Sequence, residues 1–243
     1  MCVRVDRAAG RSDLALMLPH PDPTDSPSGE PMSWLPVLSN EAMSDDQKKV
    51  FERALTKLHI EGDAPDWLRV LANAPLFLKD VFMNLDKGVF SDGGLQSKTK
   101  VLLAAVAAAH WGNQDVASFF AERARAQGFN DEQIHEALGI AATSTSFNLY
   151  YKFRSLAATD AFEGLNPGLR ASLFMRPTMG KAFAELVNLM ISTANGCASC
   201  VSGHIQEAIG NDVTKEQIDE VIRTGAIVAS ICQFVNSSER YAR

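Results

Sequence analysis

The hydrophobic residues that follow Trp34 recur every three or four positions, which is the spacing of helices with one apolar face. Polar residues suited to helix starts precede several of these runs. Ser44 and Gln47, for example, have the spacing of a capping box. No stretch shows the strict alternation of apolar and polar residues that half-buried strands require. The pattern therefore predicts an all-α fold.

Prolines and glycines indicate where the predicted helices begin and end. Pro65 and Pro75 are each expected to open a short helix, and Gly88 is the first of the glycines that break the second one. Longer helices are predicted over residues 97–110, about 113–127, about 131–153 and 181–194. The alanine-rich run within the first of these, residues 101–109, is too short to span a membrane and predicts a buried helix.

An internal repeat appears when the chain is shifted by 84 residues. The shift aligns Gly112 with Gly196 and Glu136 with Glu220, among other identities. Both copies also start a helix in the same way, with cap and third-position residues at Asn130 and Gln133 in one and at Thr214 and Gln217 in the other. The sequence thus predicts two related helical units, joined near residues 165–177, that pack together as one domain.

The expected domain organisation follows from this repeat and from the proline content. Five of the ten prolines fall within residues 1–31, mixed with Asp, Ser and Gly, so this segment is predicted to be a disordered leader. Residues 32–243 are predicted to form a single all-α domain. Its expected parts are lead-in helices at about 34–94, a degenerate repeat at about 95–160 and an active repeat at about 178–243.

Composition narrows the classes of function. The chain is 46% hydrophobic and 21% charged, which is typical of globular proteins, and its net charge of −6 argues against a nucleic-acid surface. No run of about 18 apolar residues indicates a membrane span. Four cysteines in 243 residues do not form a secreted disulfide framework, and the N-terminus lacks the features of a secretory signal. We expect a cytoplasmic protein.

The candidate chemistry lies in the stretch NGCASCVSGH. If the segment is helical, Cys197, Cys200 and His204 fall at i, i+3 and i+7, on one stripe of one face. The Asn195-Gly196 pair is typical of a turn between two helices, so Cys197 is expected near the start of the second one. There the partial positive charge of the helix terminus favours a thiolate.

Two further groups are suited to proton transfer at this dithiol. His204, four residues after Cys200, can exchange a proton with that thiol, and Glu185 on the preceding helix can hold the imidazole or a water. From the residues alone, the attacking cysteine stays open, because the helix start favours Cys197 and the imidazole favours Cys200. The arrangement predicts a redox dithiol with its own acid–base groups.

The repeat provides an internal control on this prediction. The four positions of the first copy that align with the candidate site carry different residues: Val101, Asn113, Val116 and Phe120. The turn glycine and the helix caps are shared by both copies. Had the four candidate residues served packing alone, some of them would be expected in both copies. The redox site is therefore assigned to the second copy.

The spacing Glu-x11-Cys-x2-Cys-x3-His resembles the signature of the alkylhydroperoxidase D-like family, within the carboxymuconolactone decarboxylase superfamily. The matching residues are Glu185, Cys197, Cys200 and His204. The resemblance extends to the lead-in segments from about Pro36 onward, which are similar to those of peroxidase-related members. It implies an all-α fold of two related helical halves.

The same resemblance implies a thiol-dependent peroxidase that reduces alkyl hydroperoxides. In this reading Cys200 becomes the sulfenic acid, Cys197 resolves it to a disulfide, and Glu185 and His204 relay protons. The redox-active disulfide then takes the place of any other cofactor. An external dithiol, such as that of a lipoyl-bearing protein, is the implied reductant, and the chain is expected to form a homo-oligomer. Some peroxidatic members carry a histidine where this chain has Ser199, so peroxide turnover is expected to be slower or differently tuned.

Three other interpretations remain open. The two cysteines can be small buried hydrophobes. Alternatively, Cys197, Cys200 and His204 can hold a structural metal with Glu185 or Cys232, although such sites usually draw their second ligand pair from a separate turn. A third alternative is a decarboxylase-like enzyme acting on a small lactone or carboxylate, but that chemistry does not need a second, resolving thiol.

Overall fold

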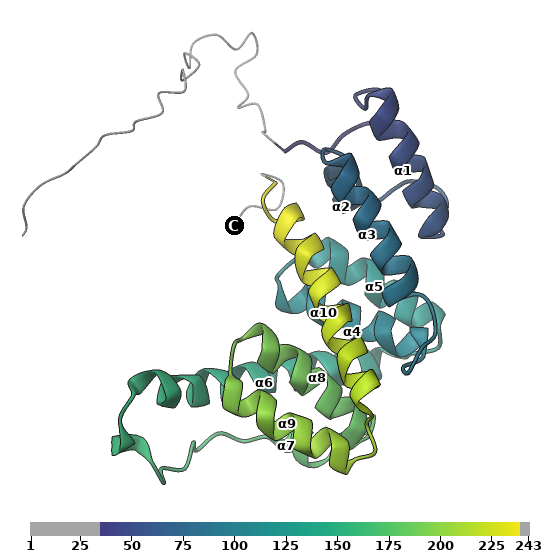
Figure 1. Cartoon of the computed structure of the whole chain (residues 1–243). Helices are drawn as coiled ribbons and strands as arrows, with labels where there is room; N and C mark the ends of the chain where they lie inside the picture. Colours follow the sequence, from purple (N-terminus) through teal and green to yellow (C-terminus); the bar gives the residue numbers. More distant parts are fainter. Residues whose placement is uncertain (1–34, 239–243) are drawn as a thin grey trace, which may run out of the picture. The chain divides into compact units, whose positions relative to one another are not determined.

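A computed structural model describes residues 35–238, and these residues form helices and no strand (Figure 1). The all-α prediction is confirmed. The predicted leader at residues 1–31 lies outside the described part of the chain. The elements are α1 (Asp45–Lys57), α2 (Asp66–Leu71), α3 (Pro75–Gly88), α4 (Ser97–His110), α5 (Gln114–Ala126), α6 (Asp131–Ala157), the 3-10 helix η1 (Asp160–Phe162), α7 (Ser172–Met175), α8 (Lys181–Ala194), α9 (Ala198–Gly210) and α10 (Lys215–Val235). Within residues 35–238, no helix has the length and apolar character needed to cross a membrane.

Local sequence signals determine where most of these helices begin. Three of them start with a complete capping box, in which the cap side chain accepts a backbone N–H and a glutamine accepts the cap's own N–H: Ser44 with Gln47, Asn130 with Gln133, and Thr214 with Gln217. Helix α6 continues to Ala157, beyond the expected end near Phe153, because the intervening residues are compatible with a helix. It ends at Ala158, which has a left-handed backbone with φ +50°.

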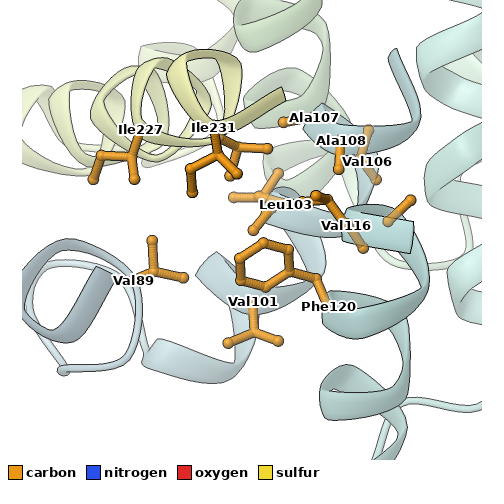
Figure 2. Packing of buried hydrophobic residues seen from close by; sticks show 14 of the residues in the cluster. Val89, Val101, Leu103, Val106, Ala107, Ala108, Val116, Phe120, Ile227 and Ile231 are labelled. Atoms are coloured by element: carbon orange, nitrogen blue, oxygen red, sulfur yellow. The ribbon is translucent and has the colours of Figure 1, made fainter. Parts of the chain in front are cut away.

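The core is built around α4, in which every residue from Lys100 to Ala108 is buried. Alanines on this helix allow its neighbours to approach closely, so that α5 lies against it on one side and α10 on another. Figure 2 shows Phe120 of α5 and Ile231 of α10 among the side chains that pack on α4. The prediction of a buried helix at residues 101–109 is confirmed except at Ala109, the single exposed residue of that run.

The two related halves, α4–α6 and α8–α10, are interlocked. Within each half the first two helices pack together, α4 on α5 and α8 on α9. The third helix of each half, however, packs more extensively on the first helix of the other half: α6 on α8, and α10 on α4. Each half therefore completes the core of the other, as expected for units that cannot bury a full core alone.

A carboxylate that recurs in both halves joins the third helix of each half to the segment that precedes the first helix of the other half. Glu220 of α10 accepts the N–H groups of Gly94 and Leu95, just before α4, at 2.8 and 2.9 Å. Glu136 of α6 accepts the N–H of Met179, just before α8, at 2.9 Å. Glu136 and Glu220 are equivalent in the repeat, as are Leu95 and Met179, so the same interaction was retained at both places.

Candidate active site

A tight turn between α8 and α9 presents the two cysteines. Gly196 has φ +66°, a left-handed conformation that glycine adopts without steric cost. The N–H of Cys197 donates to the carbonyl of Ser192 at 3.0 Å, which closes the end of α8. Cys197 is then the N-cap residue of α9. The turn predicted from Asn195-Gly196 is confirmed, and Cys197 lies at the start of the helix as expected.

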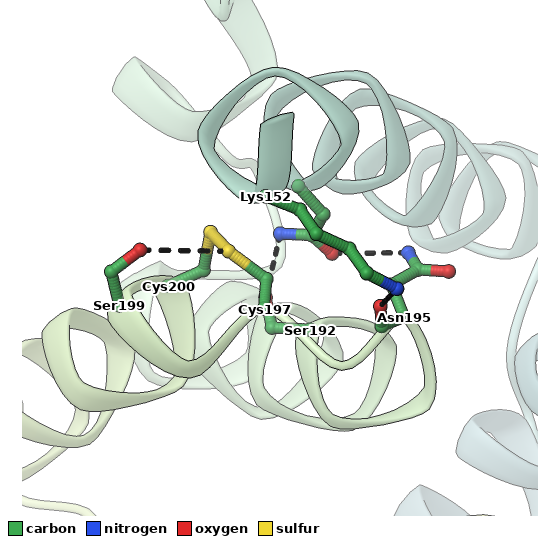
Figure 3. Close-up of a disulfide and its surroundings, with 7 residues drawn as sticks. Lys152, Ser192, Asn195, Cys197, Ser199 and Cys200 are labelled. Atoms are coloured by element: carbon green, nitrogen blue, oxygen red, sulfur yellow. Dashed lines mark hydrogen bonds between the residues drawn. A yellow bond between two sulfur atoms is a disulfide. The ribbon is translucent and has the colours of Figure 1, made fainter. Parts of the chain in front are cut away.

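Cys197 and Cys200 are joined by a disulfide, with their Cα atoms 5.3 Å apart (Figure 3). The two sulfur-bearing residues differ in accessibility, since Cys197 is 2% exposed and Cys200 is partly exposed. An N-cap position followed by the first helical turn brings residues i and i+3 together, which explains why this spacing suits a disulfide. Reagents in solution therefore reach Cys200 more easily than Cys197.

Glu185 of α8 and His204 of α9 form a short hydrogen-bonded pair. Nδ1 of the imidazole lies 2.6 Å from Oε2 of the carboxylate, and the side chains are 19% and 14% exposed for His204 and Glu185 respectively. The ring of Phe174 approaches His204 edge-on, with centroids 6.3 Å apart. A carboxylate that accepts from Nδ1 leaves Nε2 available to exchange a proton.

The histidine of this pair and the partly exposed cysteine both lie on α9, where Cys200 and His204 are separated by one helical turn. Within residues 35–238, no hydrogen bond runs from Glu185 or His204 to either sulfur. The hydrogen-bond contact of the sulfurs is with Ser199, whose Oγ lies 3.7 Å from Sγ of Cys197. The sequence-predicted residues are thus assembled in one region, with the imidazole held by Glu185 rather than by a thiol.

Helix α6 supplies a set of polar side chains that sequence reasoning did not find. Lys152 donates from Nζ to the carbonyl of Asn195 at 2.7 Å. Asn148 donates to Oγ of Ser192 at 2.9 Å and accepts from Nδ2 of Asn195 at 3.1 Å. Figure 3 shows Lys152, Ser192 and Asn195 beside the disulfide. The available signal was the pair of polar residues one turn apart on α6, in a helix expected to bury one face.

A pocket of about 640 Å³ opens beside the dithiol and has the size of a small-molecule site. Ser199, between the two cysteines, forms part of its wall. The remaining lining comes from the end of α6 and the segment after it: Tyr151, Arg154, Ser155, Ala158, Thr159, Asp160, Phe162, Glu163 and Gly164. Neither cysteine is part of the lining, so a small molecule in this pocket would meet the dithiol segment at Ser199.

The equivalent positions in the first half carry out packing and capping. Asn113, the counterpart of Cys197, caps α5 by accepting the N–H of Val116 at 2.9 Å. Val116, Phe120 and Val101, the counterparts of Cys200, His204 and Glu185, are completely buried. In the first half these four positions therefore serve the fold, and the candidate redox residues lie in the second half.

The metal interpretation receives no support from this geometry. Between residues 35 and 238, no group of three or more His, Cys, Asp or Glu side chains is arranged to hold a metal ion. Cys232 is a free, buried thiol in the core, and burial raises its pKa to about 12.

Comparisons with known proteins give the same picture of a repeated unit. The model of the carboxymuconolactone decarboxylase family matches the chain twice, over residues 78–158 and 157–240. A protein named alkyl hydroperoxide reductase AhpD from Mycobacteroides abscessus is 32% identical over 162 residues, covering 65% of this chain and 89% of the relative. Proteins of the same name from Corynebacterium aurimucosum and Anaeromyxobacter dehalogenans are 32% identical over 167 residues and 29% identical over 150 residues. They cover 65% and 62% of this chain, and 88% and 80% of their own lengths.

Proposed function

We propose a function from the premise that this chain belongs to the carboxymuconolactone decarboxylase family: it is a dithiol-dependent peroxidase that reduces alkyl hydroperoxides. Relatives named alkyl hydroperoxide reductase AhpD support this at the level of the family. The observation that carries the proposal is the disulfide between a buried N-cap cysteine and a partly exposed cysteine, one helical turn from an imidazole that is paired with a carboxylate of the preceding helix.

The peroxide step is assigned to Cys200, because its greater exposure suits attack on a substrate. The Cys200 thiolate attacks the O–O bond, the distal oxygen is transferred to sulfur, and the alkoxide takes a proton to leave as an alcohol. The thiolate of Cys197 then attacks the sulfur of the sulfenic acid. Water is released and the Cys197–Cys200 disulfide forms. The protein has lost two electrons, and the hydroperoxide has gained them.

An external dithiol closes the cycle by thiol–disulfide exchange. Its thiolate attacks the accessible Sγ of Cys200 and expels Cys197 as a thiolate. The second thiol of the reductant resolves the mixed disulfide and releases Cys200. A lipoyl-type dithiol meets the requirement for two thiols in one molecule, and a lipoyl-bearing protein is the partner we propose.

Proton transfers in both half-reactions are assigned to the Glu185–His204 pair. With Nδ1 directed at the carboxylate, Nε2 of His204 takes the proton from a thiol and returns one to the departing alkoxide or hydroxide. The carboxylate stabilises the protonated ring between these events. We expect this relay to act through water or through closer approach in the substrate complex.

Self-association forms part of the proposal. The second half of α6 exposes large apolar side chains at i, i+4 and i+7, namely Leu149, Phe153 and Leu156, with exposed fractions of 72%, 49% and 73%. Such a stripe is typical of contact surfaces. We propose that the chain forms a homo-oligomer. The reducing cytoplasm is the compartment we propose, because the cycle depends on reduced thiols.

The test is peroxide consumption with cumene hydroperoxide and dihydrolipoamide. Cys200→Ser is expected to lower turnover at least about 100-fold, because no sulfenic acid can form. Cys232→Ala removes a core thiol outside the site and is expected to retain turnover, so it serves as the matched control. Brief peroxide exposure of the reduced wild type is expected to remove two hydrogens from the peptide that contains Cys197 and Cys200. No consumption with any hydroperoxide and dithiol tried would refute the proposal.

The family's name raises a second candidate, an enzyme acting on a small lactone or carboxylate. That chemistry does not use a thiol pair, so a Cys197→Ser/Cys200→Ser variant separates the two functions. A variant that retains lactone or carboxylate turnover favours the second candidate. We favour the peroxidase because Glu185 and His204 are assembled together with both cysteines.

A further inference from the structure

Lys152 of α6 holds the turn from which Cys197 extends. Its Nζ donates to the carbonyl of Asn195 at 2.7 Å, two residues before the cysteine. The intervening Gly196 is also close, because a Cβ added there would lie 3.6 Å from Nζ. Lys152 is only partly exposed, so its charge is less screened than that of a surface lysine. A fixed positive charge therefore stands beside the N-terminus of α9.

The first half of the molecule shows what this turn requires structurally. Asn236 is the counterpart of Lys152, and its Nδ2 donates to the carbonyl of Trp111 at 2.9 Å, where Trp111 is the counterpart of Asn195. The same carbonyl is thus held in both halves, in one by a neutral amide and in the other by an ammonium. Holding the turn does not need a charge. The charge is found in the half that carries the dithiol.

We propose that Lys152 is a positioning residue of the dithiol site whose ammonium stabilises the thiolate of Cys197 when the disulfide opens. The inference deepens the proposed function and rests on it. Attack of an external thiolate on Cys200 breaks the S–S bond, and the bonding electron pair leaves on Sγ of Cys197. A lower thiol pKa makes Cys197 a better leaving group. Lys152 and the N-terminus of α9 act in the same direction.

Other charges face the same region, and their positions favour a role for Lys152. Glu185 of α8 is engaged with His204 of α9 at 2.6 Å. Asp160 and Glu163, in the segment after α6, line the pocket next to Ser199 and oppose a thiolate there. Arg154 of α6 also lines that pocket, and its guanidinium donates to the carbonyl of Leu165 and to Tyr150. Lys152 is the cation held at the turn itself.

The test is an ultraviolet titration of the Cys197 thiolate in a Cys2→Ser/Cys200→Ser background. Cys232 does not interfere, because burial raises its pKa to about 12. Lys152→Gln keeps an N–H donor, as Asn236 does, and removes the charge. It is expected to raise the Cys197 pKa by about one unit, a tenfold loss of thiolate below the pKa. Lys152→Arg keeps the charge and is expected to stay within a few tenths of a unit of the parent.

Two controls make the result decisive. Lys215→Gln removes a charge from a lysine side chain that is 89% exposed on α10, and it is expected to leave the thiol unchanged. Lys152→Asn reproduces the residue of the first half and serves if the glutamine variant folds poorly. Equal Cys197 pKa values in the parent, Lys152→Gln and Lys152→Asn would overturn the inference. The titration uses no peroxide, so the two failures are distinguishable: absence of turnover with a Lys152-dependent Cys197 pKa would reject the peroxidase and leave the stabilisation of the thiolate by Lys152 standing.

Discussion

The starts of α5 and α9 have nearly the same backbone but different residues at the cap. Asn113 has φ −104° and ψ 103°, and Cys197 has φ −94° and ψ 89°. The asparagine accepts an N–H of its helix, whereas the cysteine side chain makes no cap hydrogen bond. The second half thus lacks a stabilising interaction at the position where the first half has one, and carries a reactive sulfur there instead.

The middles of the same two helices differ in a related way. Phe120 of α5 is completely buried between α4 and its neighbours, while His204 of α9 is partly exposed and bonded to a carboxylate. Val101 occupies the position of that carboxylate in the first half. The same helical fold therefore has buried packing residues at these positions in the first half and polar, partly exposed residues in the second half. The comparison separates the residues that the fold requires from those that the proposed chemistry requires.

The largest expected effect concerns the pair Phe120 and His204. Phe120→Ala empties a buried site and is expected to lower the free energy of unfolding by about 3–5 kcal/mol. His204→Ala removes a partly exposed ring and leaves the carboxylate of Glu185 without its partner, so this substitution is expected to lower the same free energy by about 1–3 kcal/mol, while peroxide turnover falls. Urea denaturation monitored by circular dichroism measures both variants. Similar losses of stability would break the distinction between a packing half and a reactive half.

A smaller effect is expected at the cap of α5. Asn113→Ala leaves the N–H of Val116 without its acceptor and removes the 2.7 Å hydrogen bond from Nδ2 to Asn236. The expected loss of unfolding free energy is about 1–2 kcal/mol. Asn113→Ser, which keeps a capping oxygen, is the matched control and should recover part of the loss. An unchanged urea midpoint for the alanine variant would show that the cap is dispensable.

The carboxylates of Glu136 and Glu220 are each expected to contribute about 1 kcal/mol to the free energy of unfolding at pH 7, after allowance for solvent screening. The pKa of Glu220 is lowered from 4.5: burial opposes ionisation, but the N–H groups of Leu95 and Gly94 and the ammonium of Lys100 outweigh it. Because the folded pKa is the lower one, this stability is present above about 4.5 and is lost as the pH falls through the folded value.

Glu220→Gln should therefore be less stable than the wild type at pH 7, and the difference should vanish in acid. Thermal melts between pH 3 and pH 7 measure it. Glu136→Gln reports on the other crossing between the halves. A deficit for Glu220→Gln that persists unchanged at pH 3 would mean that its cause is not the charge.

The smallest expected effect is a gain. Cys197→Asn gives α9 the cap that α5 has, on a backbone that already matches. The reduced variant is expected to be more stable than the reduced wild type by about 0.5–1 kcal/mol, and to have no peroxidase activity. Denaturation in the presence of a reductant makes the comparison fair. A loss of stability would show that an asparagine cannot cap α9 as it caps α5, although the dihedral angles of the two cap residues are similar.

Local features of the fold were predictable from the sequence, because capping boxes, prolines and turn glycines act over a few residues. The proximity of Cys197 to Cys200 and of Glu185 to His204 was predictable from their spacing. Lys152 and Asn148 were not, since they reach the α8–α9 turn across 43 and 47 residues through the packing of α6 on α8. Such contacts depend on tertiary structure. The repeat contained a partial signal, the alignment of Lys152 with Asn236, whose meaning required coordinates.

The exchange of third helices has a consequence for any attempt to transplant the dithiol. The residues that buttress the cysteine-bearing turn belong to α6, on the far side of the inter-repeat connection from the cysteines themselves. A fragment starting at α8 would contain both cysteines and His204 but would lack the α6 residues that hold the turn. The dithiol site therefore cannot be transferred to another scaffold as α8 and α9 alone. A design would have to include α6 or replace the contacts that α6 makes with the turn.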